Sequence, residues 1–181
     1  MTTQELQLPG YLTGTWDIDP GHSAVAFSVR HLGISNVRGR FNSFTGQIVT
    51  AENPLDSTVS VTIEAGSVST DHEMRDGHLK GEEFLHVQEF PQLTYRSTGI
   101  RVESGEFLVD GELSLRGVTQ PVTLKLEPNG FAEGYEGIKL AGYSASVEIS
   151  RKAFGVHGGP AGAGIGDKIK IQIDIEAARQ R

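Results

Sequence analysis

The sequence predicts an all-β protein built from antiparallel strands that follow one another along the chain. Three observations support this prediction. Apolar and polar residues alternate with a period of two through most of the chain, so each strand has one apolar and one polar face. Turn-forming residues separate these stretches by hairpin-length connections. One segment, residues 69–90, departs from the alternation.

Residues 16–44 show the pattern most clearly, and we interpret them as strand, turn, strand, turn and strand. Val25, Phe27 and Val29 alternate with small or polar residues and share one face, which ends at His31. This stretch starts an antiparallel meander, and the later segments repeat its pattern.

The chain then turns and returns beside this strand. We expect the turn in residues 33–36. On the return, Phe41 and Phe44 have opposite parity, so a β-bulge near residues 42–43 is expected to reconcile the two registers. Residues 58–64 alternate cleanly and predict a half-buried strand.

Residues 69–90 predict one or two short helical turns. Asp71 is suited to cap a helix, and Met74, His78 and Leu79 fall near one face of it. Two glycines keep this helix short. The apolar residues that follow, beginning with Phe84, are expected to pack over an open end of the sheet.

Strands resume after Pro91, with apolar rows in residues 93–97, 107–115, 122–126, 143–149 and 169–175. Gly111, in the middle of one row, indicates a bend of the kind found where a sheet curls into a barrel. The chain thus holds eight or nine amphipathic strands. A sandwich of two sheets and a single closed barrel both bury such strands, and the pattern fits either.

Composition excludes several classes of protein. The net charge of −7, without any run of lysine and arginine, argues against a nucleic-acid binder. The absence of cysteine excludes disulfides, thiolate zinc sites and cysteine nucleophiles. No apolar run is long enough to span a membrane.

The N-terminal part of the chain predicts its organisation. It lacks the basic start and the apolar run of a secretory signal, so we expect a cytoplasmic protein. Residues 1–14 are mostly polar and contain Pro9 and Gly10, which is typical of a flexible lead-in. Residues 15–181 then form one domain, a common size for an all-β barrel.

Motifs for catalysis and cofactor binding are not found. The glycine-rich residues 154–168 have the wrong glycine spacing for a phosphate-binding loop, and a strand follows instead of a helix. The histidines lack metal-ligand spacing, and we expect His22 and His31 to be hydrogen-bonded at strand ends or at the rim of a pocket. No serine lies in a nucleophile motif, and Asp71 and Asp76 fit a charged helix surface.

The apolar inner rows allow two interpretations. They form either an ordinary packed core or a tunnel for a long apolar ligand. Small residues among them leave room, which favours a tunnel: Gly39, Gly46, Gly111, Ala141 and Ala145.

Five segments in order along the chain closely resemble the YceI-like family, and together they extend over nearly all of the chain after residue 14. They read WDIDPGHSAVAFSVRHLGISNVRGRF, STDHEMRDGHLKGEEFLHVQEFPQLTY, GELSLRGVTQPV, ISRKAFGV and GDKIKIQI. The resemblance implies a lipocalin-like fold, an extended antiparallel eight-stranded β-barrel with an amphiphile in its central pore. It also implies a homodimer and a ligand of the polyisoprenoid or isoprenoid-quinone type.

We therefore expect a lipid-binding protein and not an enzyme, which transports or stores a polyprenyl phosphate, an isoprenoid quinone or a similar lipid. We expect no catalytic residue, no metal and no cofactor other than such a bound lipid. The alternative is a lipid isomerase or cyclase that uses the same cavity, with His31 and Tyr143 as its titrating groups. A barrel filled with side chains would instead indicate a structural, partner-binding protein.

Strand parity gives the residues that we expect to contact the ligand. Met74, Leu79 and Phe84 are expected to close one end of the tunnel, and His31 and Arg151 to meet a polar head group. The remaining residues are expected to line its wall: Val25, Phe27, Val29, Phe41, Phe107, Val109, Leu113, Val122, Leu124, Tyr143 and Val147.

Overall fold

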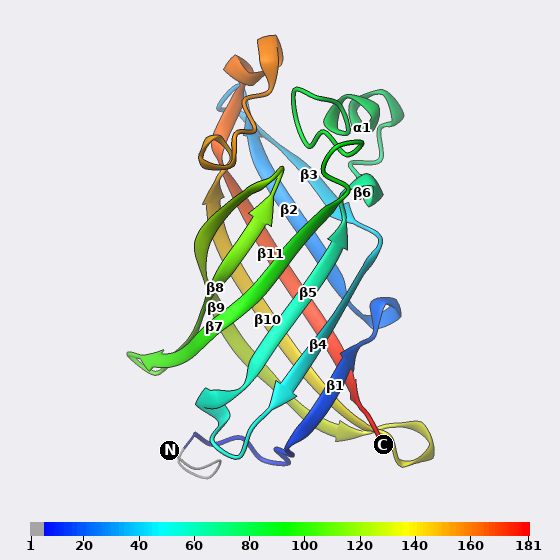
Figure 1. Ribbon diagram of the computed structural model, residues 1–181, viewed down its shortest axis with the longest axis vertical. Helices are drawn as coiled ribbons and strands as arrows, with labels where there is room; N and C mark the ends of the chain where they lie inside the picture. The colour runs from blue at the N-terminus through cyan, green and yellow to red at the C-terminus, as the bar shows by residue number, and fades with distance from the viewer. Residues whose placement is uncertain (1–5) are drawn as a thin grey trace.

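The computed structural model describes residues 6–181 and contains one sheet of eleven strands that closes on itself (Figure 1). We call the end with α1 (Glu73–Leu79) the upper end, and the opposite end, where the described chain begins and where the C-terminus lies, the lower end. The strands are β1 (Gly14–Ile18), β2 (Ala24–His31), β3 (Ser35–Phe41), β4 (Phe44–Thr50), β5 (Thr58–Glu64), β6 (Val68–Ser69), β7 (Gln92–Glu103), β8 (Glu106–Leu115), β9 (Val118–Glu133), β10 (Lys139–Ser150) and β11 (Ile165–Arg179).

Single turns of 3₁₀-helix interrupt the connections between strands. They are η1 (Pro20–His22), η2 (Pro54–Asp56), η3 (Ala65–Ser67), η4 (Tyr135–Gly137), η5 (Lys152–Phe154) and the longer η6 (Gly159–Gly164). Within residues 6–181, no helix is long and apolar enough to cross a membrane.

The long strand β11 closes the barrel. One of its edges pairs with β10. Its other edge pairs first with β2 and then, nearer the chain end, with β1. Since β1 also pairs with β4, the sheet has eight strand positions and returns to its starting strand. The prediction of a closed antiparallel barrel is confirmed, and the sandwich is excluded.

The sequence predicts a β-bulge near residues 42–43, but the structure instead breaks the strand there into β3 and β4, which pair with β2 and β1 respectively. On its other edge, β3 pairs with β6 only at Arg40 and Phe41. In the described part of the chain, residues 35–39 therefore have no strand partner on that edge. The barrel wall is interrupted there, beside the segment that carries α1.

The turn between β2 and β3 lies earlier than residues 33–36, where the sequence predicted it. Leu32 and Gly33 have positive φ angles of 52° and 72°, and the amide of Ile34 donates to the His31 carbonyl oxygen at 3.1 Å. β3 already begins at Ser35. Gly33 does occupy the turn, whereas the local preference of Asn36 for turns was outweighed by strand pairing across the hairpin.

The cap of α1 differs from the prediction. His72 is the N-cap, and its Nδ1 accepts a hydrogen bond from the amide of Arg75 at 3.1 Å. Asp71 has a left-handed φ of 58°, whereas an N-cap residue is extended. The Asp71 carboxylate binds Arg40 on β3 instead, at 3.1 Å. This ion pair joins the α1 segment to the interrupted side of the wall.

Three inner glycines do not open the lumen as the sequence suggested, because large side chains of neighbouring strands occupy the space beside them. A Cβ atom on Gly39 would lie 2.4 Å from the ring of Phe27, and one on Gly46 would lie 2.6 Å from Ile18. On Gly111 it would lie 2.4 Å from the Tyr95 hydroxyl oxygen.

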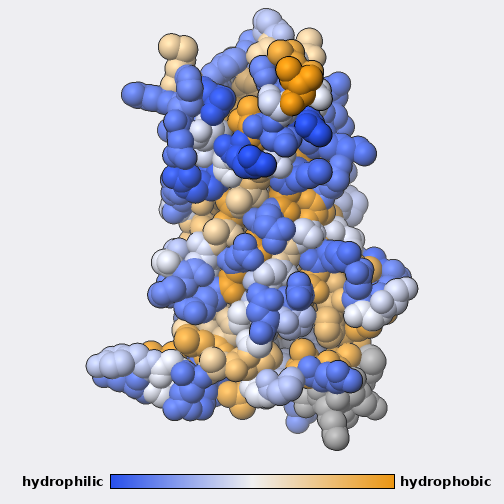
Figure 2. All heavy atoms as spheres, turned by 180° about the vertical axis from the view of Figure 1, so that it is seen from behind, coloured by the Kyte–Doolittle hydropathy of each residue, from blue (hydrophilic) through white to orange (hydrophobic). Residues whose placement is uncertain are grey.

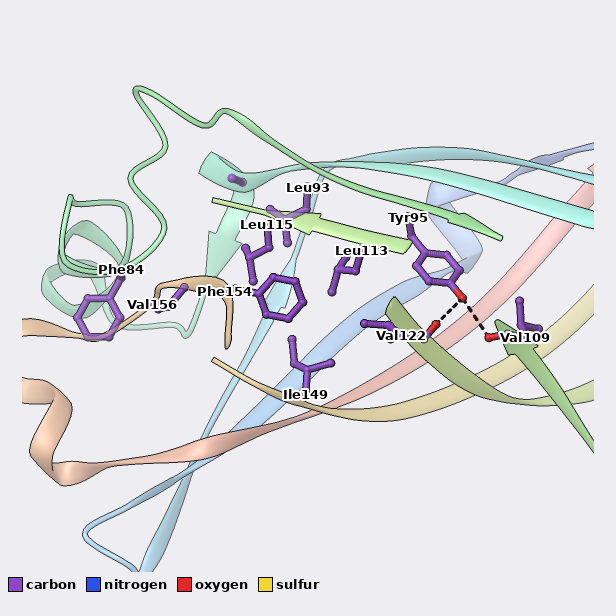
Figure 3. Close-up of a cluster of buried hydrophobic side chains, with 11 residues drawn as sticks. Phe84, Leu93, Tyr95, Val109, Leu113, Leu115, Val122, Ile149, Phe154 and Val156 are labelled. Carbon is purple, nitrogen blue, oxygen red and sulfur yellow. Dashed lines mark hydrogen bonds between the residues drawn. The ribbon is translucent and has the colours of Figure 1, made fainter. Parts of the chain in front are cut away.

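The ring of Tyr95 thus runs along the wall from β7 over Gly111 on β8. Its hydroxyl group hydrogen-bonds to the carbonyl oxygens of Val109 and Val122, both at 3.1 Å (Figure 3). Gly111 is therefore required for close packing of a tyrosine against the sheet.

We expect Gly111→Ala to destabilise the protein by roughly 1–3 kcal/mol, because the new methyl group overlaps Tyr95 and the Arg96 carbonyl oxygen. Gly99→Ala is the matched control, since a Cβ atom there meets nothing within 4 Å. Urea unfolding of both variants measures the difference. Equal stability of the two variants would contradict this account of Gly111.

Candidate functional site

An elongated cavity of about 520 Å³ lies inside the barrel. Its lining extends from Tyr11 and Phe131 at the lower end to Leu79 and Phe84 at the upper end. Between these ends the lining consists almost entirely of aliphatic and aromatic side chains from the strands. A cavity of this volume is typical of a site for one small molecule.

The isoleucines of β11 show how long the cavity is. Ile165 and Ile175 both line it, and they are about 33 Å apart along an extended strand. Strands in barrels tilt, so the lined length along the axis is about 25 Å. The cavity is therefore long and narrow, a shape that suits an extended hydrocarbon chain.

Aromatic side chains form the lower end of the cavity. Phe131 lies at its centre, with ring centroids 6.0 Å from Trp16, 6.3 Å from Tyr143 and 5.7 Å from Tyr11, all in edge-to-face geometry. Trp16 is 1% exposed, and its Nε1 donates to the hydroxyl oxygen of Thr50 at 2.9 Å. This cluster closes the lower end with apolar rings whose polar atoms are mostly bonded to the wall.

The lower end also includes part of the expected lead-in, residues 1–14. The Tyr11 hydroxyl donates to the carbonyl oxygen of Ala51 at 2.6 Å, and Leu8 borders the cavity. Residues 1–5 of the lead-in lie outside the described residues. From Leu8 onward, the lead-in packs against the barrel.

Two loops cover the upper end. Phe84, in the loop after α1, is 6% exposed and packs edge-to-face on His78 at 4.9 Å. The amide of Gly158, just before η6, donates to the Glu83 carbonyl oxygen at 2.9 Å, which joins the two loops. Figure 3 shows the buried side chains following one another from Tyr95, well inside the barrel, to Phe84. As the sequence predicted, the apolar residues after α1 pack over an end of the barrel.

Arg151 holds the second of these loops in place. It is 3% exposed, and its guanidinium donates five hydrogen bonds of 2.9–3.0 Å to backbone carbonyl oxygens. The acceptors are Val156, His157, Gly162, Ile165 and Gly166. These bonds use all five N–H donors of the side chain. Arg151 borders the cavity, but it is a structural residue and has no free donor for a ligand head group, contrary to the prediction.

With this geometry established, comparison with known proteins identifies the family. The model of the YceI-like domain matches residues 16–177. The chain belongs to the YceI-like family. Protein YceI of Salmonella arizonae and that of Salmonella enteritidis are each 38% identical to it over 168 residues, which is 91% of this chain and 86% of theirs.

Solved structures with the same fold agree with this assignment. A YceI protein from Campylobacter jejuni is 27% identical, with a TM-score of 0.75 over 84% of this chain and 90% of its own. BcnA of Burkholderia cenocepacia is 20% identical, with a TM-score of 0.76 over 88% and 98%. A polyisoprenoid binding domain from Saccharophagus degradans is 14% identical, with a TM-score of 0.71 over 93% and 100%. At these lower identities the last two show the fold alone.

The YceI-like barrel places fifteen of the sixteen residues selected from the sequence around the cavity. They are Val25, Phe27, Val29, His31, Phe41, Leu79, Phe84, Phe107, Val109, Leu113, Val122, Leu124, Tyr143, Val147 and Arg151. Strand parity thus located the inner face of most strands, because a period of two leaves little ambiguity once one face is apolar.

Met74 is the exception, and the prediction that it closes the tunnel is wrong. It is 81% exposed. α1 directs Arg75, His78 and Leu79 toward the cavity, and Met74 lies about 100° away from Arg75 around the helix axis. α1 has only seven residues, and its apolar residues lie near opposite ends of it. Such a pattern is too short to predict which face of the helix points toward the barrel.

Other residues that were not predicted as ligand contacts also line the cavity. The β11 isoleucines formed a visible alternating row, and β5 contributes Val59, Val61 and Ile63 from a strand that was predicted. Their parity contained the signal. His78 was predicted to share a helix face with Leu79, which also lines the cavity. Arg75 carried no such signal, because only the position of α1 over the barrel brings it to the cavity.

The two candidate titrating groups of an enzyme lie at opposite ends. His31 is paired with Ile165 and Tyr143 with Ile175, so roughly 30 Å of strand separates them. Burial raises the pKa of the Tyr143 hydroxyl far above its ordinary value, which keeps it protonated. This arrangement does not form an acid–base pair.

A separate polar cluster lies outside the cavity. His22 Nδ1 is 2.7 Å from Asp19 and 3.4 Å from Glu176, and the side chains are substantially exposed. Sequence spacing could not reveal it, because Glu176 comes from β11. His22 is hydrogen-bonded beside the start of β2, as predicted.

We expect Arg151→Met to destabilise the protein by about 3 kcal/mol or more, because several buried carbonyl oxygens lose their donor. Lys152→Met is the control, since this neighbouring side chain is exposed. Chemical denaturation measures both. A loss for Arg151→Met as small as that of the control would show that the five bonds do not matter.

A pH dependence follows from the cluster around His22. The hydrogen bond that His22 donates to the Asp19 carboxylate, with the charge of Glu176, raises the pKa of His22 above its ordinary value of 6.5. A raised folded-state pKa stabilises the fold below the ordinary pKa, and this stabilisation is lost as pH rises through the folded-state value. We expect the stability difference between wild type and His22→Gln to shrink from about pH 6 to pH 8. A difference independent of pH would refute the interaction.

Proposed function

We propose that this protein binds one long-chain amphiphilic lipid, an isoprenoid or a similar molecule, with the hydrocarbon chain lying along the cavity. The observation that carries this proposal is the long apolar cavity, closed by aromatic rings at its lower end. The polyisoprenoid binding domain from Saccharophagus degradans, which has the same fold, adds support. From this proposal follows a role in transport or storage of the lipid.

The energetics favour a long chain. Each methylene group moved from water into an apolar lining gains about 0.8 kcal/mol. Association itself costs roughly 4–15 kcal/mol. On the order of ten or more buried carbons are therefore needed before binding becomes tight. The lined length of about 25 Å accommodates a chain of this kind.

The distribution of polar groups orients the ligand. His31, Arg75 and His78 border the cavity at its upper end. The lower end presents only neutral groups, such as Thr50 and the protonated hydroxyl of Tyr143. We therefore place the head group, a phosphate or a quinone ring, at the upper end and the end of the chain on the aromatic cluster.

A carrier fits these observations better than an isomerase or cyclase. Chemistry on a bound lipid needs a titrating group close to the reacting atoms. The cavity wall is aliphatic between its ends, and His31 and Tyr143 are too far apart to act together. The homodimer and the cytoplasmic location stay predictions.

Organic extraction of the purified protein, followed by mass spectrometry, tests the proposal. We expect a long-chain lipid in about one copy per chain, or uptake of added polyprenol or quinone by protein that was stripped of lipid. Failure to recover a lipid, together with failure to take one up, would contradict the proposed function.

Filling the cavity should prevent this uptake. Ala145 is 7% exposed and faces the cavity, so Ala145→Trp is expected to reduce lipid uptake by about tenfold or more. Ser146→Trp is the matched control, because the next residue of the same strand points outward. Val147→Phe fills less volume and serves if Ala145→Trp does not fold. Undiminished uptake by folded Ala145→Trp and Val147→Phe would place the lipid elsewhere.

A further inference from the structure

The hairpin between β2 and β3 ends in two exposed apolar side chains. Leu32 is 64% exposed and Ile34 is 82% exposed. The hairpin lies at the upper end of the barrel, and Figure 2 shows strongly hydrophobic atoms on the surface there. Large aliphatic side chains are usually buried in a folded protein. Neighbouring apolar side chains that stay exposed often mark an interaction site.

The conformation of Leu32 makes its identity unusual. Both central residues of this turn have positive φ angles, and Asn, Asp or Gly normally occupy such positions. A leucine in this region costs free energy. Leu32 therefore sits where both the backbone and the exposure favour a polar residue. An observed outlier of this kind supports a functional explanation.

The hairpin is also basic, although the protein as a whole has a net charge of −7. Residues 24–51 contain no aspartate or glutamate. Arg30 and Arg38 flank the turn on its two strands, and both are exposed. The adjoining η6 consists of glycine, proline and alanine, and it accepts a hydrogen bond from the Leu32 amide at the Gly164 carbonyl oxygen, 2.8 Å away. An apolar tip between cations is the result.

The cavity begins directly below this tip. Val29, Val37 and Ile165 line the cavity within a few residues of the turn, and the exposed His31 borders it. Beside them, residues 35–39 of β3 form the unpaired edge of the wall. The apolar tip thus stands beside the interrupted part of the wall, which we take as the mouth of the cavity.

We infer that the β2–β3 hairpin docks on the surface of an anionic lipid bilayer, with Leu32 and Ile34 inserted among the lipids and Arg30 and Arg38 against their head groups. Apolar side chains flanked by cations are the combination that binds such surfaces. The inference rests on the proposed function, because docking there places the cavity mouth against the source of a lipid ligand. Acidic residues of the α1 segment, such as Glu73 and Glu82, are also exposed at the upper end, so the contact with the membrane is confined to the hairpin tip.

Flotation with vesicles tests this inference. We expect the protein to bind vesicles of phosphatidylcholine with phosphatidylglycerol, and to bind phosphatidylcholine alone more weakly. The double variant Leu32→Asn/Ile34→Ser should reduce binding to the anionic vesicles by about tenfold or more. Arg38→Gln should reduce it about fivefold, and added salt should weaken the wild type.

Tyr135→Ser is the matched control. Tyr135 is 84% exposed on η4 at the lower end, so it is as accessible as Ile34 but far from the mouth. Vesicle binding by this variant should equal that of the wild type. Loss of binding in this variant as large as in the hairpin variant would overturn the inference.

Folding does not confound the experiment, because Leu32→Asn introduces a residue that the turn prefers. The double variant should therefore keep the melting temperature of the wild type. Ile34→Trp gives a second readout: its emission should shift to the blue with anionic vesicles, whereas Trp16 is already buried.

The outcomes separate this inference from the proposed function. Hairpin variants that lose vesicle binding but still take up lipid delivered in detergent would support docking. Wild-type binding by the double variant, or no vesicle binding by the wild type, would overturn it. A change of oligomeric state in the double variant without vesicle binding would assign the tip to a second copy of the chain and also overturn it. Vesicle binding without any lipid uptake would leave docking intact and refute the proposed function.

Discussion

The structure depends on the pairing of β11 with two successive strands along one edge. Because β2 and β1 together match the length of β11, the sheet closes without one very long partner strand. Closure satisfies the backbone hydrogen bonds of the wall and encloses the apolar faces of the strands. Closure also requires the break between β3 and β4, because β3 pairs with β2 whereas β4 pairs with β1. The unpaired edge of β3 is thus a consequence of the way the barrel closes.

The two ends of the cavity differ in construction, and this difference gives the site a direction. The lower end is closed by rings that pack on one another, and most of their polar atoms are bonded to the wall. The upper end is covered by two loops whose positions depend on two arginines, the buried Arg151 and the half-buried Arg116. Arg151 holds the loop around η6, and Arg116 donates to the carbonyl oxygens of Glu82 and Gly155, one in each loop. Loops held by side chains can separate without disturbing the strands, whereas the aromatic end is part of the wall.

Sequence reasoning located the strands and most of the lining, because a period of two assigns every side chain to a face. The change of parity between Phe41 and Phe44 was visible for the same reason, although it marks a break between β3 and β4 and not the predicted bulge. The features that the sequence did not predict depend on contacts between segments that are distant in the chain. Asp71 binds Arg40 instead of capping α1, and Met74 faces solvent. Arg151 donates its hydrogen bonds to backbone carbonyl oxygens of a later loop. The choice between a barrel and a sandwich also depended on closure, which local periodicity does not contain.

The aromatic–glycine neighbours in the wall have a consequence for how the family diversifies. Phe27 and Tyr95 run along the sheet because Gly39 and Gly111 leave space for the ends of their rings. A larger residue in place of either glycine would push the aromatic ring toward the barrel axis and narrow the cavity. A smaller residue in place of the aromatic one would widen the cavity. Substitutions at one such aromatic–glycine pair therefore change the width of the cavity without changing the number or tilt of the strands. Homologues of one architecture can in this way come to enclose cavities of different width.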